Sequence, residues 1–233
     1  AEPQSFNHSL DLPLPPLPLP LPLLLLPFLL RSPLALNADA VLAVLLDGAR
    51  ALATNDDVRV IVLKGNGKHF QAGADLAWLN EVRHGTPDEN LAVSQRTTDA
   101  VRELDQCMKP TVALVHGACF GGGTGILAAC DVVVASDDAI FSIAEVRWGL
   151  HAGPIIPQLA AAIGPRQVRR YAITAERFDA VKAEQLGLVH AVCSRDHLED
   201  TGAKIVDSIL MNGPSAVSAH CESSERSAVT RAA

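Results

Sequence analysis

The stretch Gly117–Asp131, GACFGGGTGILAACD, places three consecutive glycines between an apolar run, TVALVH (residues 111–116), and a small-residue apolar segment. The apolar run is typical of a buried strand, and the small-residue segment is typical of a helix. Glycine costs free energy inside regular structure, so such a cluster needs a reason, for example a positive φ angle or close approach of another molecule to the backbone. The stretch therefore predicts a strand, a turn that can hold a ligand, and a helix.

Three ligand-binding interpretations of these glycines can be compared. A phosphate-binding loop requires Lys followed by Ser or Thr at the end of the glycine frame, where this chain has Thr124 and Gly125. A dinucleotide-binding loop requires a sixth-position glycine, which counted from Gly121 is Ile126. The third interpretation is a helix N-terminus whose free N–H groups, at residues 121–123, bind an oxygen atom. The alternative is that the glycines only allow tight packing of a helix against a strand.

Strands and helices alternate along the rest of the chain. The patterns predict strands at residues 58–65, 111–117, 131–136, 139–143 and 188–193. They predict helices at residues 37–54, from 76, 91–108, 121–130, 155–164, 165–174, 179–187 and 196–211. In the helix at 91–108, Thr97, Val101, Leu104 and Met108 are expected to face inward. This order predicts an α/β fold with mostly parallel strands.

The two ends of the chain differ from this pattern. Residues 10–30 are almost entirely Leu and Pro, and seven prolines stand between Pro13 and Pro27. Proline removes helix hydrogen bonds, which argues against a membrane helix or a signal peptide and favours an edge strand or irregular packing. We therefore divide the chain into an atypical N-terminal segment (1–33), a core domain (34–192) and a C-terminal helical segment (193–233). The tail from Gly213 has no strong period, and part of it is expected to be disordered.

Composition excludes several kinds of partner. The 19 Lys and Arg residues and 26 Asp and Glu residues give a net charge of −7, and no basic run with interleaved aromatics is present, so nucleic acid is not expected as a partner. The five cysteines form no C-x-x-C pair, which favours a reduced, cytoplasmic protein without a zinc site. His69, His116 and His151 lack ligand spacing on one element, so no metal is expected.

A second small-residue turn, HFQAGADL (residues 69–76), also stands between a strand and a helix. Its backbone N–H at Ala74 could supply one half of a two-donor oxyanion hole, with the glycine stretch supplying the other. A third motif is FSIAEVRWGL (residues 141–150). In this order and at these separations, the three motifs resemble the crotonase superfamily, also called the enoyl-CoA hydratase/isomerase family, over about residues 36–192.

The resemblance implies a fold and a ligand. The fold would be a spiral of strand-strand-helix turns with a C-terminal helical part, assembled as a homotrimer or a dimer of trimers. The ligand would be an acyl-CoA whose thioester oxygen accepts hydrogen bonds from the backbone N–H groups of Ala74 and Gly122. The implied substrate-binding residues are Ala72, Ala74, Asp75, Leu76 and Gly121. Coenzyme A would be part of the substrate, so no separate cofactor is implied.

Hydratases of this superfamily commonly use two glutamates, and here the chain departs from the pattern. The second glutamate matches Glu145, but the first falls on Gly125. One carboxylate can suffice if it takes a proton from water and returns it to the α-carbon of the enolate. A partly buried Glu145 would have a raised pKa, which suits a proton shuttle.

The segments FSIAEVRWGLHAGPIIPQL and RRYAITAERF further resemble hydratases of branched glutaconyl-CoA esters, the methylglutaconyl-CoA and isohexenylglutaconyl-CoA hydratases of leucine and acyclic-terpene breakdown. Such substrates carry a second carboxylate, which Arg147 could bind; alternatively Arg147 is exposed or pairs with a neighbouring subunit. The resemblance thus implies a hydratase of a 3-branched enoyl-CoA. A double-bond isomerase using the same glutamate, and a non-catalytic acyl-CoA-binding or assembly subunit, are the alternatives.

Overall fold

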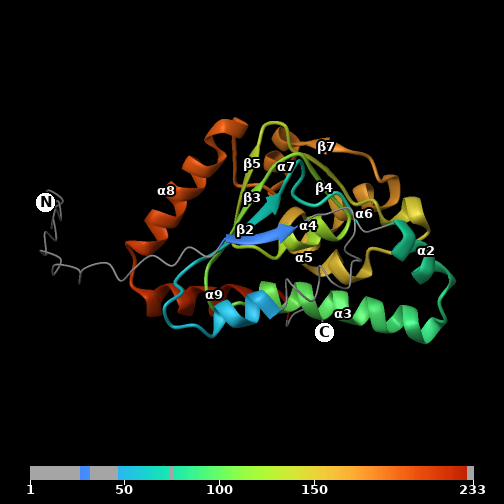
Figure 1. Ribbon diagram of the computed structural model, residues 1–233, viewed down its shortest axis with the longest axis horizontal. Coiled ribbons are helices and arrows are strands. Elements are labelled where there is room, and N and C mark those ends of the chain that lie inside the picture. Colours follow the sequence, from blue (N-terminus) through green and yellow to red (C-terminus); the bar gives the residue numbers. More distant parts are fainter. Residues whose placement is uncertain (1–26, 32–46, 74–75, 230–233) are drawn as a thin grey trace, which may run out of the picture.

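The computed structural model of the chain describes residues 27–31, 47–73 and 76–229 (Figure 1). Five strands form a parallel sheet in the order β1-β2-β3-β5-β8. Three shorter strands form a second sheet in the order β4-β6-β7, in which β4 and β6 are parallel and β7 is antiparallel to β6. The strands are β1 (Pro27–Arg31), β2 (Ile61–Asn66), β3 (Thr111–Val115), β4 (Ala118–Phe120), β5 (Val132–Ser136), β6 (Ile140–Ser142), β7 (Phe178–Asp179) and β8 (Ala191–Cys193).

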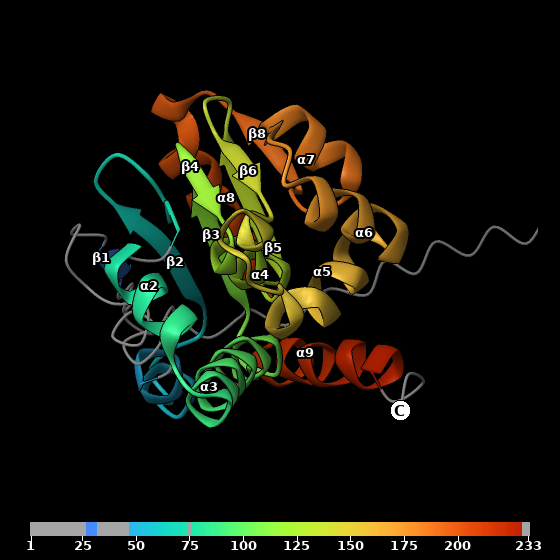
Figure 2. The ribbon, with the colours of Figure 1, turned by 90° about the vertical axis from the view of Figure 1, so that its right-hand side faces the viewer.

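Helices follow the strands and surround the two sheets (Figures 1 and 2). Residues 47–53 are helical, and the longer helices are α2 (Leu76–His84), α3 (Pro87–Asp105), α4 (Gly122–Ala128), α5 (Ile156–Ile163), α6 (Pro165–Thr174), α7 (Ala180–Leu186), α8 (Leu198–Leu210) and α9 (Pro214–Val229). Three short 3-10 helices are η1 (Glu145–Trp148), η2 (Gly153–Ile155) and η3 (Arg195–His197).

Strands β3 and β5 of the large sheet are each followed by a strand of the small sheet. Strand β3 leads into β4 and then α4, and β5 leads into β6 and then η1 and α5. This repeat is the strand-strand-helix order that the sequence predicts, and the parallel pairing of the large sheet is confirmed as well. The repeat stacks β4 and β6 in front of the large sheet, as Figure 2 shows, so the residues after β4 and after β6 come out on the same side.

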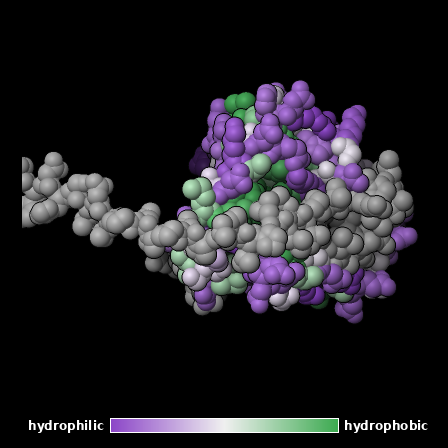
Figure 3. All heavy atoms as spheres, turned by 60° about the vertical axis from the view of Figure 1, so that its left-hand side comes forward, coloured by the Kyte–Doolittle hydropathy of each residue, from purple (hydrophilic) through white to green (hydrophobic). Residues whose placement is uncertain are grey.

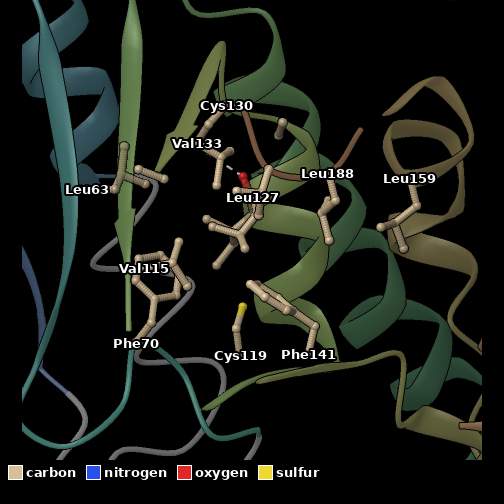
Figure 4. Packing of buried hydrophobic residues seen from close by; sticks show 14 of the residues in the cluster. Leu63, Phe70, Val115, Cys119, Leu127, Cys130, Val133, Phe141, Leu159 and Leu188 are labelled. Atoms are coloured by element: carbon tan, nitrogen blue, oxygen red, sulfur yellow. Dashed lines mark hydrogen bonds between the residues drawn. The ribbon is translucent and has the colours of Figure 1, made fainter. Parts of the chain in front are cut away.

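The large sheet is buried on both faces, because helices cover each side. Residues at alternate positions of β2 and β3, such as Val62 and Leu114, pack with Leu198 and Val206 of α8. The intervening residues, such as Leu63 and Val115, face the larger core, where Leu127 of α4 and Phe141 of β6 also lie (Figure 4). The face of the molecule seen in Figure 3 is mainly hydrophilic over its upper part, with hydrophobic side chains gathered near its centre.

One local expectation holds in the structure. Part of the Leu/Pro-rich run forms the edge strand of the described sheet, because β2 is the one described strand that β1 pairs with. Residues 37–46 of the first predicted helix lie outside the described residues. Asp131, at the end of the glycine stretch, ties two strands together, because one of its carboxylate oxygens accepts hydrogen bonds from the Thr111 backbone N–H at 2.7 Å and from the Thr111 hydroxyl at 2.8 Å.

Other expectations are wrong. Residues 118–120, expected in the turn, form β4 by pairing with β6. Helix α3 begins at Pro87 because Thr86 and Glu89 form a capping box, and it ends at Asp105, so Met108 lies beyond it and is 40% exposed. Residues 214–229 of the tail after Gly213 form α9, in which Cys221 is buried, and disorder in part of the tail stays a prediction. The domain boundaries at 33 and 192 stay predictions.

Candidate active site

The glycine stretch adopts the conformation that its sequence requires. Gly121 has φ 56° and ψ −129°, a backbone region that is open essentially to glycine alone. Its N–H donates to the Ser142 carbonyl of β6 at 2.8 Å, and its own carbonyl accepts from the Thr124 N–H and hydroxyl. These bonds start α4 at Gly122. No acceptor for the Gly122 N–H is found among the described residues, which leaves this donor available to a ligand.

Glycines 121 and 122 face different surroundings. A Cβ atom added to Gly121 would lie 3.1 Å from Oε1 of Glu145, so the Glu145 carboxylate lies directly against this backbone. A Cβ added to Gly122 would meet nothing within 4 Å among the described residues that are not its chain neighbours. Gly122 therefore borders open space, and it lines the same cavity as Glu145.

Gly125 has the opposite environment. A Cβ added there would lie 2.2 Å from Cγ2 and 2.5 Å from Cβ of Ile155, whose side chain is 1% exposed. The branched Ile155 side chain thus occupies the volume that any side chain at position 125 would need. Gly125 is fixed by packing, and a carboxylate at this position would require Ile155 to move.

Glu145 is the first residue of η1, and two residues separate it from the end of β6. Within the described part of the chain, its buried Oε2 atom has no hydrogen-bond partner. Burial raises the pKa of the Glu145 carboxyl, and a hydrogen bond from the residue's own backbone N–H opposes that shift. The Leu150 N–H closes the turn on the Glu145 carbonyl at 3.1 Å, and Gly149 adopts a left-handed φ of 72°. The fold therefore holds a carboxyl with one unsatisfied oxygen in a fixed place.

The loop after residue 70 is tied to β4. Gln71 exchanges backbone hydrogen bonds with both neighbours of Cys119: its N–H donates to Ala118 and its carbonyl accepts from Phe120. Its side-chain oxygen accepts the Gly73 N–H at 2.9 Å. These bonds bring Ala72 and Gly73 beside the glycine stretch. Sequence reasoning missed this role of Gln71. The motif HFQAGADL, which contains Gln71, could have indicated it.

A cavity of about 220 Å³ joins these elements. Its described lining consists of Ala72, Gly73, Phe120, Gly121, Gly122, Ser142, Ala144, Glu145, Arg147, Trp148, Leu150 and Arg177. The cavity thus combines one buried carboxyl, one free backbone donor, two guanidinium groups and an apolar wall. A larger cavity of about 280 Å³ between η1, α5 and α6 is lined mainly by apolar side chains and holds His151 and Arg169 as its charged or titratable residues.

The predicted site residues can now be placed. Ala72, Gly121, Gly122, Glu145 and Arg147 all line the cavity. Ala74 and Asp75 lie outside the described residues, and Leu76 is the first residue of α2, with its side chain outside the described part. The Arg147 guanidinium donates to the Ala175 carbonyl at 2.8 Å. Sequence reasoning missed Arg177, which directly precedes β7, 32 residues after Glu145; it lies within the segment RRYAITAERF, which was noted for its resemblance and not as part of the site.

Comparison with known proteins identifies the family. The family model for enoyl-CoA hydratase/isomerase matches residues 29–232 of this chain. The chain belongs to the enoyl-CoA hydratase/isomerase family. The enoyl-CoA hydratase crystal structure from Shewanella pealeana superposes with a TM-score of 0.76 at 33% identity, covering 80% of this chain and 69% of that one. The strand-strand-helix fold is therefore the crotonase fold, as the three motifs predict.

Curated relatives within the enoyl-CoA hydratase/isomerase family carry different names. A peroxisomal Δ(3,5)-Δ(2,4)-dienoyl-CoA isomerase of Arabidopsis thaliana is 36% identical over 72% of this chain and 64% of its own length. A mevalonyl-coenzyme A hydratase of Aspergillus fumigatus is 34% identical over 70% of this chain and 60% of its own length. The chain thus spans somewhat less than two thirds of the length of these relatives.

None of the helices within residues 47–73 and 76–229 is both long and apolar enough to cross a bilayer. The same residues contain no group of three or more His, Cys, Asp or Glu side chains placed to hold a metal ion.

Proposed function

We propose that this protein is a hydro-lyase that adds water to the double bond of a 3-branched, glutaconyl-CoA-type enoyl thioester, such as isohexenylglutaconyl-CoA or methylglutaconyl-CoA. The observation that carries the proposal is the Glu145 carboxyl, buried with one unsatisfied oxygen against Gly121 and beside the free Gly122 N–H. Coenzyme A is part of the substrate, and no separate cofactor is required.

In this mechanism the thioester oxygen accepts a hydrogen bond from Gly122, with the N–H of Ala74 as the second proposed donor. Ionised Glu145 takes a proton from water while the water oxygen bonds to the β-carbon and the π electrons move to the thioester as an enolate. Protonated Glu145 then gives that proton to the α-carbon, which restores the thioester and the carboxylate. Each oxyanion donor is worth about 2.7–4 kcal/mol of barrier when aimed at the developing charge.

The packing at Gly125 supports a mechanism with one carboxylate. Ile155 fills the space that a second catalytic glutamate would need, so proton removal and proton return both fall to Glu145. A raised pKa suits this double role, because it makes the ionised carboxylate a stronger base and keeps the protonated form populated nearer the working pH until the proton is returned.

A second candidate function is movement of a double bond within an enoyl-CoA. It uses the same carboxyl to take a proton from one carbon and return it to another, and it needs no bound water. The relative from Arabidopsis thaliana is named as an isomerase, whereas the relative from Aspergillus fumigatus is named as a hydratase. Proteins similar to this chain are therefore named for both reactions. The single carboxylate supports either reaction.

The test is incubation of the protein with a panel of enoyl-CoA esters, including a branched glutaconyl-CoA, in water enriched in ¹⁸O. Loss of the enoyl-thioester absorbance with one ¹⁸O atom in the product supports hydration. A shifted double bond without ¹⁸O supports isomerisation and overturns the hydratase. Binding of the esters without any turnover would overturn both and leave a non-catalytic acyl-CoA-binding subunit.

Assembly and location belong to the same proposal. We expect a homotrimer or a dimer of trimers, measured as the mass in solution by sedimentation equilibrium, and a cytoplasmic protein. Relatives named as peroxisomal or mitochondrial make fractionation of cells the measurement that decides the location.

A further inference from the structure

The charges that line the catalytic cavity do not balance. Among its described lining residues, Arg147 and Arg177 carry positive charge and Glu145 alone carries a carboxyl group. No ion pair joins Glu145 to either arginine in the described part of the chain, and burial favours the neutral form of Glu145. The cavity therefore has an excess of positive charge that the protein itself does not neutralise.

One of the two guanidinium groups is committed to the fold. Nη2 of Arg147 donates to the Ala175 carbonyl at 2.8 Å, and the buried Ser142 hydroxyl donates to the same carbonyl at 3.1 Å. Ala175 has a left-handed φ of 49°, so these bonds hold the turn between α6 and β7 against β6. Arg147 thus has a structural task at one end of its guanidinium.

Arg177 has no such task. It is exposed, and its guanidinium carbon lies 5.2 Å from the centre of the Phe120 ring. The carboxylates next to it in sequence are engaged elsewhere: Glu176 pairs with Arg170 at 2.6 Å, and Asp179 accepts the Lys182 N–H as the cap of α7. Among the described residues, no carboxylate forms an ion pair with Arg177.

The fold fixes this guanidinium relative to the reacting groups. Phe178, the next residue, pairs with Phe141 of β6, and two residues separate the end of β6 from Glu145. Phe120, which supports the guanidinium, immediately precedes Gly121 and Gly122. Stacking on an aromatic face leaves the N–H groups at the guanidinium edge able to donate to a planar anionic group. Arg177 therefore presents donors on the wall that also carries Glu145.

We propose that Arg177 binds an anionic oxygen group of the bound thioester, either a carboxylate at the far end of the acyl chain or a phosphate of coenzyme A. The proposal rests on the proposed function in taking an acyl-CoA as the ligand, and it names the class of substrate group that this site recognises. A carboxylate or phosphate can accept two parallel N–H donors from a guanidinium, which gives orientation as well as affinity.

The experiment measures binding rather than turnover, so it is independent of whether the protein hydrates or isomerises. Four saturated, unreactive thioesters are titrated calorimetrically: glutaryl-CoA and butyryl-CoA, and the corresponding pantetheine thioesters, which lack the phosphates of coenzyme A. The variants are Arg177→Gln, Arg177→Lys and a control, Arg102→Gln. Arg102 is exposed on α3 and pairs with Asp99 one turn earlier, outside the cavity.

An acyl carboxylate as the ligand group predicts that Arg177→Gln weakens both glutaryl thioesters by roughly tenfold or more and leaves both butyryl thioesters unchanged. A coenzyme A phosphate predicts the same loss for both CoA thioesters and none for the pantetheine thioesters. Arg177→Lys should recover part of either loss, and Arg102→Gln should show none.

Equal losses for all four ligands, or no loss for any of them, would overturn the proposal. If Arg177→Gln does not fold, Arg177→Lys provides the same comparison, since loss of the paired geometry should still separate the four ligands. The enoyl-CoA panel could show no turnover while Arg177→Gln still separates the four thioesters in binding. That result would refute the proposed reaction and leave the binding role of Arg177 in place.

Discussion

Glu145 combines two properties that oppose each other: it must ionise to act as a base, yet burial favours its neutral form. The cost of ionisation makes the carboxylate a stronger base, because taking up a proton removes the buried charge. Its neighbours explain how the fold tolerates this, because Gly121 approaches the carboxylate without a side chain and Gly122 leaves open space beside it.

Replacing Glu145 by Gln removes the proton shuttle but keeps the shape of the side chain. We expect turnover of the best enoyl-CoA to fall by about 10²–10⁴-fold, the usual contribution of a positioned acid or base, as measured by the enoyl-thioester absorbance. Substrate binding should change little. Turnover within a few-fold of the wild type would refute the assignment of Glu145 in both proposed reactions.

The same variant has a pH signature in stability. The folded pKa of Glu145 is raised above its unfolded value of about 4.3, so its protonation stabilises the fold fully below that pH, and this contribution is lost as the pH rises through the folded pKa. Gln cannot ionise. The melting temperature of Glu145→Gln relative to the wild type should therefore rise between pH 4 and pH 8; a difference that stays constant would contradict the raised pKa.

Gly121 and Gly122 form a matched pair for substitution by Ala. At Gly121 the positive φ costs about 1–3 kcal/mol, and the new methyl would press on the Glu145 carboxylate, so both stability and kcat should fall. At Gly122 the methyl enters open space, so the melting temperature should hold while KM rises because the thioester loses close approach. Identical melting temperatures for the two variants would contradict this geometry.

At the scale of elements, α4 and η2 pack so closely that position 125 of α4 has no room for a side chain. Gly125 lies against Ile155, although the two are 30 residues apart and neither forms part of the other's motif. The glycine cluster predicted the turn, the helix and the free donor, because those depend on local backbone conformation. It could not predict why position 125 is glycine, because the reason is a side chain from a later element.

This contact gives a double-mutant prediction. Gly125→Ala should lower the free energy of unfolding by about 1–3 kcal/mol through overpacking. Ile155→Ala should lower it by about 2–5 kcal/mol through loss of buried volume. Combined, the two should cost less than their sum, since the new methyl at 125 no longer meets a branched side chain. Urea unfolding of the four proteins measures the coupling, and simple additivity would refute it.

At the scale of the whole molecule, alternation and capping signals predicted the parallel sheet and most helices, and the three motifs predicted which loops meet. The prediction failed where contacts are distant in sequence. Strand β4 exists through pairing with β6, and Arg177 is brought to the cavity because the next residue begins β7, which pairs with β6, so the local sequence does not show where either one lies. Met108 was placed inward because helical spacing extended past Asp105, where the chain leaves the helix.

Because the large sheet has a separate core on each face, a substitution in the core under α8 should change stability without changing activity. A Cβ added to Gly202 of α8 would lie 2.6 Å from Cδ2 of Leu114, which faces away from the cavity. Gly202→Val should therefore lower the free energy of unfolding by about 1–3 kcal/mol while kcat and KM, measured well below the melting temperature, stay close to wild type. A changed KM at unchanged stability would contradict the separation.

The smaller core beneath α8 also sets how the molecule fluctuates. It contains seven buried residues, Val60, Val62, Val112, Leu114, Val134, Leu198 and Val206, whereas the core on the other face joins most of the remaining elements. A layer held by few contacts opens locally at a lower free energy than the whole domain. Amide hydrogens of α8 should therefore exchange with solvent through local opening of α8, while β3, α4 and the cavity that contains Glu145 stay folded. The protein would then spend part of its time with α8 detached from the sheet and the cavity unchanged.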